Sequence, residues 1–301
     1  MKKAMVYICG EDFFAPSLVS CCSFNAKYYD DVDRFIYICT DSDSFVTRAQ
    51  QHCTDNKINV QIKNMNIDVA KDFPLMAHLH PAAYGRLFLQ DYLDPSYQRV
   101  LYIDGDTLAG PVELDFEVEL SGKTFGAVQD IGVVASGTAD QLLLQPPGQA
   151  AKYFNAGVLI IDWPLWCAQE IGPRCVQYIS ANPDLLYGDQ CALNNVCIGK
   201  WLDLHPSWNT QTDFLSNPDL VGVAKVYHFT GAAKPWQRDL WKHNIDFSEY
   251  YEKTLRAHPF DAVFRPATLK SSVKRGLRSV ETTLNPRRVK NWAGWVAEHY
   301  G

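Results

Sequence analysis

The sequence predicts an α/β fold built around a mainly parallel central sheet, and three observations predict it. Short apolar, β-branched runs alternate with helical stretches through the first hundred residues. Acidic side chains follow two of those runs, at the places where the strands of such a sheet end. The 301 residues are 47% hydrophobic and 21% charged, which is typical of a soluble globular protein with a large core. Strands separated by helices are joined by crossovers and lie parallel.

Each strand and helix expected in the first hundred residues is predicted from the local spacing of its apolar residues. The expected strands are Ala4–Cys9, Phe35–Cys39, Asn59–Lys63 and Val100–Ile103. The expected helices are Pro16–Lys27, Ser44–Cys53 and Ala82–Tyr92. Ligands of such sheets bind beyond the carboxyl ends of the strands. The acidic residues expected at that edge are Glu11, Asp12, Asp104 and Asp106.

The pattern is less regular beyond residue 130. Residues 138–149 predict a surface loop, and residues 153–166 predict a buried strand that turns into a helix. Further on, Lys225–Tyr227 predicts a short strand that delivers His228.

The segment RVLYIDGDTLAG, residues 99–110, ends an apolar strand with Asp104 and Asp106, which only Gly105 separates. Two neighbouring carboxylates repel each other, so a strand that presents both usually needs a cation. An Asp-Gly pair is also the ordinary mark of a turn. The segment alone leaves both interpretations open.

His228 offers a third group for a metal site. Two carboxylates and one imidazole suit a borderline-hard divalent ion such as Mn²⁺, with Mg²⁺ as the alternative. In VYHFTGAAKPW, residues 226–236, Gly231 would let the backbone approach a phosphate and Lys234 would neutralise one. A single histidine is more often structural than a ligand, but these neighbours favour a ligand.

Four more polar residues stand beside expected buried elements: Arg86, Asn155, Asp189 and Gln190. The structural alternatives are plain, since Asp189 could cap a helix, Asn155 could be a turn residue and Arg86 could lie on a helix surface. Arg86 could equally donate to the anionic ligand that the carboxylates serve.

The C-terminal segment, residues 266–301, differs from the acidic body before it. Residues 265–290 hold eight Lys or Arg and one acidic residue, although the whole chain has a net charge of −6. Leu269, Val273 and Leu277 recur there at helical spacing, and aromatic residues follow. A basic amphipathic helix with aromatic neighbours predicts association with an anionic membrane surface. The alternative is a C-terminal helix that packs on the domain with its basic face in water.

Charge and cysteine content limit the partners and the compartment. The acidic net charge argues against nucleic acid as a partner. Nine cysteines without a C-x-x-C spacing indicate a reducing compartment and neither a disulfide framework nor a zinc site. We therefore expect a cytoplasmic protein that is held peripherally on the inner face of the cytoplasmic membrane.

Taken together, five segments resemble glycosyltransferase family 8: AAYGRLFL, RVLYIDGDTL, YFNAGVLIID, YGDQCALN and YHFTGAAKPW. They occur in the family's order, and the resemblance covers residues 4–236. It implies a GT-A (Rossmann-like) nucleotide-sugar-binding fold in a catalytic domain, residues 1–265, followed by a membrane-association segment, residues 266–301. It further implies a retaining, Mn²⁺-dependent enzyme that uses a UDP-sugar, similar to the bacterial members that add hexoses to lipopolysaccharide.

The resemblance also implies roles for individual residues. Those implied to ligate Mn²⁺, which bridges the donor's diphosphate, are Asp104, Asp106 and His228. Those implied to bind the donor are Glu11, Asp12, Phe14, Arg86, Asp104, Gly105, Asp106, Asn155, Asp189, Gly231 and Lys234. Those implied to act in catalysis are Gln190, Asp189 and Asp130, the last in the sugar and acceptor region.

One departure from the family concerns uridine recognition. Many members carry an acidic residue, Asn and Tyr after the first strand, whereas GEDFFAP has Phe13 and Phe14 in the last two places. Phe14 could still stack on the base, and Glu11 or Asp12 could accept from its N–H. The tyrosine hydroxyl contact is lost.

The resemblance thus implies transfer of galactose or glucose from a UDP-sugar to a glycan acceptor, such as lipopolysaccharide core or another lipid-linked sugar. Gln190 is an amide and a poor nucleophile, which favours front-face attack assisted by the leaving phosphate, while Asp189 keeps a covalent intermediate open. Two alternatives use the same residues: a metal-dependent nucleotide-sugar phosphohydrolase, and a non-catalytic sugar-nucleotide-binding protein.

Overall fold

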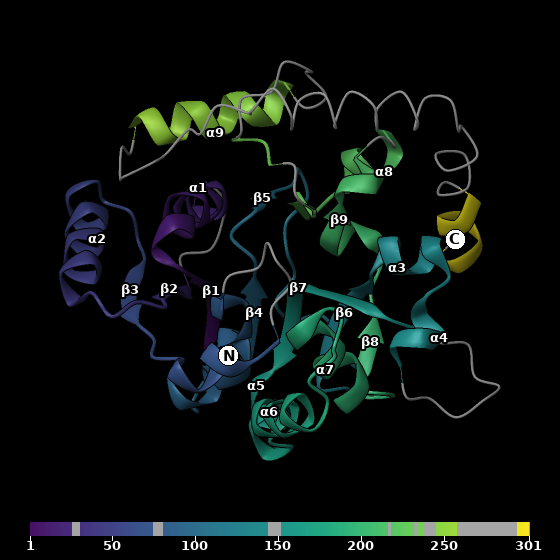
Figure 1. Cartoon of the computed structure of the whole chain (residues 1–301). Helices are drawn as coiled ribbons and strands as arrows, with labels where there is room; N and C mark the ends of the chain where they lie inside the picture. Colours follow the sequence, from purple (N-terminus) through teal and green to yellow (C-terminus); the bar gives the residue numbers. More distant parts are fainter. Residues whose placement is uncertain are drawn as a thin grey trace, which may run out of the picture.

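A seven-stranded, mainly parallel sheet forms the centre of the molecule (Figure 1). The computed structural model describes residues 1–25, 31–74, 81–143, 152–215, 218–231, 234–236, 245–257 and 294–300. The strands of this sheet are β1 (Lys3–Cys9), β2 (Val32–Ile38), β3 (Gln61–Asn64), β4 (Arg99–Ile103), β6 (Phe125–Gln129), β7 (Phe154–Asp162) and β8 (Trp201–Asp203).

The strand order is β3-β2-β1-β4-β7-β6-β8. β1 pairs in parallel with both β2 and β4, and Lys3 is opposite Val32 and Arg99. β7 runs antiparallel to β4 and to β6, and β8 is parallel to β6. The predicted mainly parallel sheet is confirmed, and the carboxyl ends of β1 and β4 meet at one edge.

Helices cover the two faces of the sheet because the side chains of its central strands alternate between them. Met5 and Tyr7 of β1 pack toward α1 and α2, whereas Val6 packs with the 3₁₀ helix η3 and with α6 and α7. The α-helices are α1 (Phe14–Asn25), α2 (Asp43–Asp55), α3 (Ile131–Ser136), α4 (Ala139–Leu142), α5 (Trp163–Ala168), α6 (Ile171–Ala181), α7 (Gly188–Val196), α8 (Pro218–Val223) and α9 (Ile245–Ala257). The 3₁₀ helices are η1 (Glu11–Phe13), η2 (Asp68–Asp72), η3 (Pro81–Asp91), η4 (Pro206–Asn209) and η5 (Thr212–Phe214).

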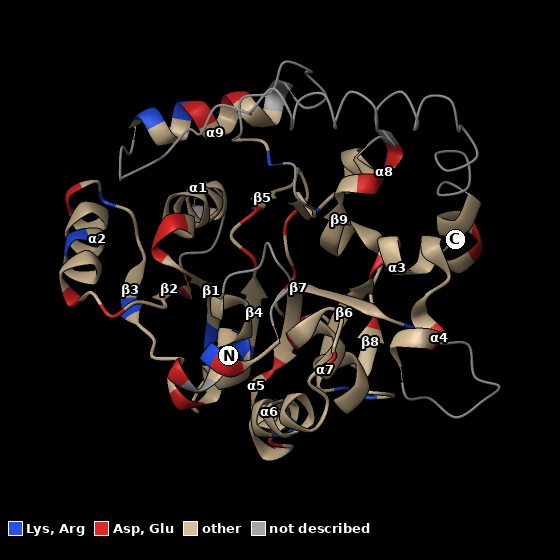
Figure 2. Cartoon of the chain, viewed as in Figure 1, with Lys and Arg blue, Asp and Glu red and all other residues tan. Residues whose placement is uncertain are grey.

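A second, three-stranded sheet lies at the carboxyl edge of the first. Its order is β5 (Thr107–Ala109), β10 (Val226–His228) and β9 (Thr210–Gln211). β5 leaves the end of β4 after a short acidic connection, which Figure 2 shows near the centre of the molecule.

Most of the predicted elements are present, with boundaries shifted by a few residues. The helix expected over 82–92 has 3₁₀ geometry, and the strand expected at 225–227 is β10. The expected surface loop over 138–149 was partly wrong, because its first residues form α4; residues 144–151 lie outside the described part of the chain.

The end of the predicted C-terminal tail packs on the domain. Residues 294–300 are helical, and Trp295 and Val296 contact a buried cluster beside α3. The Tyr300 hydroxyl donates to Asp203 Oδ1 at 2.7 Å and accepts from Gln129 Nε2 at 3.3 Å. Residues 258–293, which hold most of the basic helix predicted from sequence, lie outside the described residues.

Among the residues that the structure describes, no helix is both long enough and apolar enough to span a bilayer.

The contacts of Tyr300 give a prediction about the role of residues 294–300. Tyr300→Phe removes both hydrogen bonds to β6 and β8 and should lower the free energy of unfolding by about 1–2 kcal/mol, measured by urea denaturation. Tyr178→Phe in α6 is the control, since its hydroxyl has no hydrogen bond within the described structure. Equal losses in the two variants would show that the Tyr300 bonds contribute nothing.

Candidate functional site

The second sheet brings His228 beside the end of β4. β10 pairs antiparallel with β5, so that His228 is opposite Thr107. The Phe229 amide donates to the Asp106 carbonyl oxygen at 2.9 Å and continues this pairing. Residues that are far apart in the chain therefore meet at the carboxyl edge of the central sheet.

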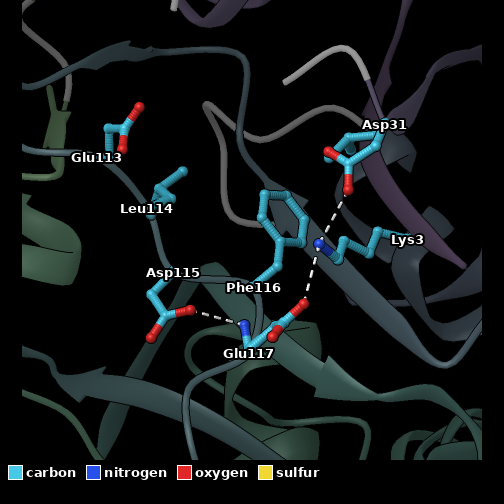
Figure 3. A pocket seen from close by; sticks show the side chains of 8 residues that line it. Lys3, Asp31, Glu113, Leu114, Asp115, Phe116 and Glu117 are labelled. Carbon is cyan, nitrogen blue, oxygen red and sulfur yellow. Dashed lines mark hydrogen bonds and ion pairs between the residues drawn. The ribbon is translucent and has the colours of Figure 1, made fainter. Parts of the chain in front are cut away.

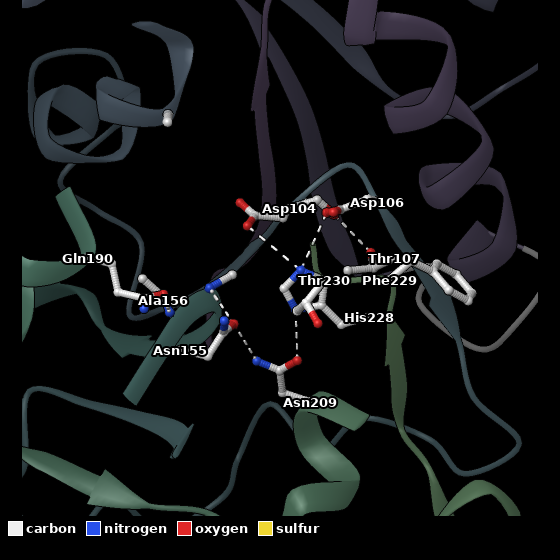
Figure 4. A network of polar contacts seen from close by, with 12 residues as sticks. Asp104, Asp106, Thr107, Asn155, Ala156, Gln190, Asn209, His228, Phe229 and Thr230 are labelled. Carbon is white, nitrogen blue, oxygen red and sulfur yellow. Dashed lines mark hydrogen bonds and ion pairs between the residues drawn. The ribbon is translucent and has the colours of Figure 1, made fainter. Parts of the chain in front are cut away.

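Asp104, Asp106 and His228 form a candidate metal centre (Figure 4). One ligand atom of each residue lies within 4.8 Å of the other two. His228 Nε2 is 3.4 Å from Asp106 Oδ1 and 3.9 Å from Asp104 Oδ2. Two carboxylate oxygens and one imidazole nitrogen fit a divalent ion such as Mn²⁺, as the sequence predicted.

Each carboxylate of this pair has a cation at its outer oxygen. Asp104 Oδ1 is 3.1 Å from Arg86 Nη2, and Asp106 Oδ2 is 2.5 Å from Lys234 Nζ. The inner oxygens, Asp104 Oδ2 and Asp106 Oδ1, face His228 Nε2. The two cations offset the repulsion between the carboxylates while the inner oxygens stay turned toward the imidazole.

Lys234 is fixed at the site by two contacts. Besides Asp106, its ammonium donates to the Phe229 carbonyl oxygen at 2.8 Å. Burial alone would raise the pKa of Asp106, but the Lys234 ammonium and the neighbouring His228 ring outweigh it and hold that pKa well below its usual range. Asp106 is therefore ionised at neutral pH.

Arg86 joins the carboxylate pair to Asp189. Its buried guanidinium donates to Asp104 Oδ1 through Nη2 and to the Ala156 carbonyl through Nη1, and its Nε is 2.9 Å from Asp189 Oδ2. It also lies over the Tyr102 ring, at 4.4 Å from the centroid. Burial lowers the pKa of Arg86, and the nearby Asp104, Tyr102 and Asp189 raise it by more. The positive charge of Arg86 thus stabilises both the Asp104 and the Asp189 carboxylates.

Asp189 has an unusual titration. It is 5% exposed and lies in the first turn of α7. Burial raises its pKa to about 6, against the opposing effect of Arg86, and the charge of Asp104 adds to the increase. Asp189 therefore titrates closer to neutral pH than an ordinary carboxyl group.

A network of amide side chains surrounds the other predicted residues. Asp130 Oδ2 accepts from Asn155 Nδ2 and from Gln190 Nε2, each at 3.1 Å. Asp130 Oδ1 caps α3 by accepting from the Val133 amide, and Gln190 Oε1 accepts from the Ala156 amide at 3.0 Å. The structure thus brings together Asp130, Asn155 and Gln190, three of the residues predicted to bind the donor or to act in catalysis, and each of their side chains is held at both ends.

Three residues at the site were missed by the sequence analysis. Tyr102 donates to Asp104 Oδ1 at 2.7 Å, and its position two residues earlier on the same strand was an available signal. Asn209 contacts His228 and Asn155, and no pattern in the sequence indicated these contacts.

Gly157 is the third missed residue. A Cβ there would lie 2.6 Å from Asp104 Oδ2 and closer still to His228 Cε1. Only a glycine lets β7 pass this close to the metal centre.

The predicted residues around the uridine are less closely grouped. Glu11 and Asp12 are exposed in η1, where Glu11 accepts from the Thr40 hydroxyl. Phe14 was predicted to stack on the base, but it is 0% exposed and packs edge-on against Phe45 in the core. That prediction does not fit the structure, because α1 begins at Phe14 and turns its ring inward. Phe13 is half-buried and contacts the Trp236 ring.

The two predicted glycines have different reasons to be glycine. A Cβ on Gly105 would lie 3.0 Å from Ser17 Cβ and nearer to its hydroxyl, so α1 packs directly on the connection between the carboxylates. Gly231 is exposed and has a φ of 82°, a left-handed conformation that glycine adopts without strain.

A pocket outside this site lies at the opposite end of β1 (Figure 3). Lys3 bridges Asp31 at 3.0 Å and Glu117 at 3.3 Å there. The remaining lining is acidic or apolar, and the pocket is separate from the residues described above.

Comparisons of sequence agree with this arrangement. A sequence model described as "Glycosyl transferase family 8" matches residues 23–240. General stress protein A of Bacillus subtilis is 31% identical over 199 residues, which cover 58% of this chain and 68% of that protein. A lipopolysaccharide 1,3-galactosyltransferase of Salmonella typhimurium is 27% identical over 209 residues, or 65% of this chain and 60% of that enzyme.

Comparisons of structure give the same picture. A galactosyltransferase, LgtC, solved with donor and acceptor sugar analogs, superposes with a TM-score of 0.69 at 22% identity, covering 85% of this chain and 99% of that one. The bifunctional glycosyltransferase WbbM superposes with a TM-score of 0.64 at 18% identity, covering 85% of this chain and 50% of that one. These likenesses show a shared fold.

The close approach of β7 gives a prediction for Gly157. Gly157→Ala should displace His228 or Asp104 and weaken Mn²⁺ binding by at least about tenfold, measured by isothermal titration calorimetry. Gly222→Ala in α8 is the control, because a Cβ there meets nothing within 4 Å. Unchanged affinity in Gly157→Ala would show that the three residues do not bind the ion together.

The raised pKa of Asp189 gives a prediction about stability. A folded-state pKa of about 6, against an ordinary 3.8, means that the folded protein binds this proton more tightly, so the group costs stability as the pH rises through that range. Asp189→Asn should therefore make the metal-free protein more stable at pH 7 by roughly 1–3 kcal/mol. The difference should disappear near pH 4, and a destabilised variant at pH 7 would contradict the assigned shift.

Proposed function

Because the chain belongs to glycosyltransferase family 8, and is therefore a glycosyltransferase with the GT-A fold, we propose that it moves galactose or glucose from a UDP-sugar to a glycan acceptor with retention of configuration. The observation that carries this proposal is the grouping of Asp104, Asp106 and His228 beside Lys234 and Arg86. Such a grouping of anionic ligands and cations suits a divalent ion together with a diphosphate.

The proposed metal ligands are Asp104 Oδ2, Asp106 Oδ1 and His228 Nε2, and the proposed ion is Mn²⁺. The bound ion would supply charge stabilisation to the diphosphate as it leaves. Lys234 would contact the same diphosphate from the Asp106 side, since its ammonium already lies at the edge of the metal centre. Gly231 would let the backbone approach a phosphate oxygen.

The donor sugar would lie between Arg86, Asn155 and Asp189. Arg86 holds Asp189 at 2.9 Å and so fixes the carboxylate that would accept hydrogen bonds from sugar hydroxyls. Because the pKa of Asp189 is about 6, this carboxylate would be mostly ionised at neutral pH and able to accept.

The transfer would follow front-face attack. The bond from the anomeric carbon to the UDP oxygen breaks, the acceptor oxygen bonds to the same face, and the acceptor's proton passes to the leaving phosphate. Gln190 would lie behind the anomeric carbon as a fixed dipole that stabilises positive charge there. Its amide is held by Asp130 and Ala156, which supports an orienting role over a nucleophilic one. Asp130 would then act by orienting Gln190 and Asn155.

The uridine would bind near η1. Glu11 and Asp12 are exposed and can accept from the base N–H. We propose Phe13, and no longer Phe14, as the ring that stacks on the base, because Phe13 is half-buried and ends η1 directly after Glu11 and Asp12.

The proposed acceptor is a glycan on lipopolysaccharide core or another lipid-linked sugar. The names of relatives support it, since one adds galactose to lipopolysaccharide and another is a lipopolysaccharide 1,2-glucosyltransferase of Escherichia coli. The basic segment within residues 266–301 would hold residues 1–265 on the inner, anionic face of the cytoplasmic membrane.

A metal-dependent phosphohydrolase would share the metal centre but would need neither Gln190 nor an acceptor. UDP release that is equally fast with and without acceptor glycan would favour it. We expect release to require the acceptor, measured with UDP-galactose and UDP-glucose in the presence of Mn²⁺.

The metal proposal gives a prediction for Asp106. Asp106→Ala should leave the fold intact and weaken Mn²⁺-dependent UDP binding by more than about 100-fold, because one of three protein ligands is lost. Asp115→Ala, in the pocket at the opposite end of β1, is the control for calorimetry. Retained affinity in Asp106→Ala would exclude this metal site.

The membrane proposal is tested with substitutions that remove positive charge. A truncation is unsuitable, because residues 294–300 pack on the domain and their loss would disturb it. Replacement of Lys270, Lys274, Arg275 and Arg278 by Gln should weaken binding to anionic vesicles by at least about tenfold, since each basic side chain near such a surface contributes about 1 kcal/mol. Turnover on a soluble acceptor and binding to neutral vesicles should not change. Equal binding to anionic vesicles would refute the anchor.

A further inference from the structure

We propose that Asn209 is a positioning residue that keeps the proton of His228 on Nδ1, so that Nε2 is directed to the metal with its lone pair free. The inference rests on the proposed metal centre, but it concerns a residue outside the ligand set. It follows from a chain of hydrogen bonds that runs from Asp130 through Asn155 and Asn209 to His228. Figure 4 shows the part of this chain from Asn155 to His228.

The direction of this chain is fixed at its Asp130 end. A carboxylate oxygen only accepts, so the Asn155 group at 3.1 Å from Asp130 Oδ2 must be the NH₂. The Gly157 amide, which only donates, lies 3.1 Å from the other end of the Asn155 side chain, so that end must be the oxygen. Two independent partners therefore determine the orientation of Asn155.

The orientation of Asn155 then determines that of Asn209. Asn155 Oδ1 lies 2.9 Å from the Asn209 side chain and can only accept, so the Asn209 group there is Nδ2. Asn209 Oδ1 is left facing His228 Nδ1 at 2.9 Å. An amide oxygen accepts, so His228 Nδ1 must carry the hydrogen.

The other ring nitrogen faces the metal centre. His228 Nε2 lies 3.4 Å from Asp106 Oδ1 and 3.9 Å from Asp104 Oδ2. A neutral imidazole protonated at Nδ1 has its lone pair on Nε2, which is the form that ligates an ion. The opposite tautomer would direct an N–H at the place of the ion.

Burial makes this bond hard to replace. Asn209 is 0% exposed and His228 is 3% exposed, so bulk water does not compete for Nδ1. The backbone around the network is also held. Gln211, which is paired with His228 across β9 and β10, donates to the Gln129 carbonyl at 2.8 Å and accepts from the Ile131 amide at 3.1 Å, on either side of Asp130.

A set of substitutions separates positioning from general stability. Asn209→Leu keeps the branching and the number of side-chain heavy atoms and removes the acceptor. Asn209→Asp is the conservative variant that keeps an acceptor for Nδ1. Asn194→Leu is the matched control. Asn194 is equally buried, at 1% exposed, and bonds the Phe154 backbone and not His228.

Two measurements on the full chain test the proposal. ¹⁵N NMR of histidine-labelled protein, without metal and with diamagnetic Mg²⁺, reports whether His228 Nδ1 carries a hydrogen. Titration of Mn²⁺ alone, followed by electron paramagnetic resonance, gives the affinity without any catalytic step. We expect Nδ1–H in the wild type and in Asn194→Leu, and its loss or mixing with the other tautomer in Asn209→Leu.

The Mn²⁺ affinity should fall about 10–100-fold in Asn209→Leu, recover most of that loss in Asn209→Asp and change little in Asn194→Leu. A wild-type His228 without a hydrogen on Nδ1, or an unchanged affinity in Asn209→Leu, would overturn the inference. Wild-type protein that binds no Mn²⁺ but shows Nδ1–H on His228 would refute the proposed metal and leave the role of Asn209 in setting the tautomer standing.

Discussion

The repulsion between Asp104 and Asp106 is the constraint on which the rest of the site depends. One strand ends in both carboxylates, and neither can move away because α1 packs on the glycine between them. Arg86 and Lys234 each neutralise one outer oxygen. The inner oxygens remain turned toward His228, so the two carboxylates stay together even in the absence of a bound cation.

Beyond the two carboxylates, single charged groups also contact two partners each. Arg86 serves Asp104 and Asp189 with one buried charge, and Asp130 orients two amides with one oxygen. Most of these groups make hydrogen bonds at both ends, so the side chains have little freedom before any ligand arrives. In a preorganised polar site of this kind, the side chains need to reorient little when charge develops in a reaction, so the reorganisation energy is small.

The sequence predicted the parts of the site whose chemistry is local. The residue types of the DGD segment and of His228 indicated a cation site. The apolar runs predicted the positions of the strands to within a few residues. Arg86 does lie at the site, where it contacts Asp104 and Asp189. Asn209 and Gly157 were not predicted, because their contacts join segments that meet only in the folded chain. The prediction that Phe14 stacks on the base does not fit for a related reason. The direction of its ring depends on where α1 begins, and a residue pattern predicts the start of a helix only to within about one turn.

The pairing of β10 with β5 has a consequence for how the protein folds. Lys234 lies 128 positions from Asp106, and His228 reaches its place only through that long-range strand pair. Contacts of such separation form late, because the entropy of closing a long loop opposes them. A nascent chain in which β4 has just left the ribosome therefore contains Asp104 and Asp106 but not yet His228. An ion that needs all three proposed ligands could not bind during these early stages of folding, because the three residues meet only after the two sheets have joined.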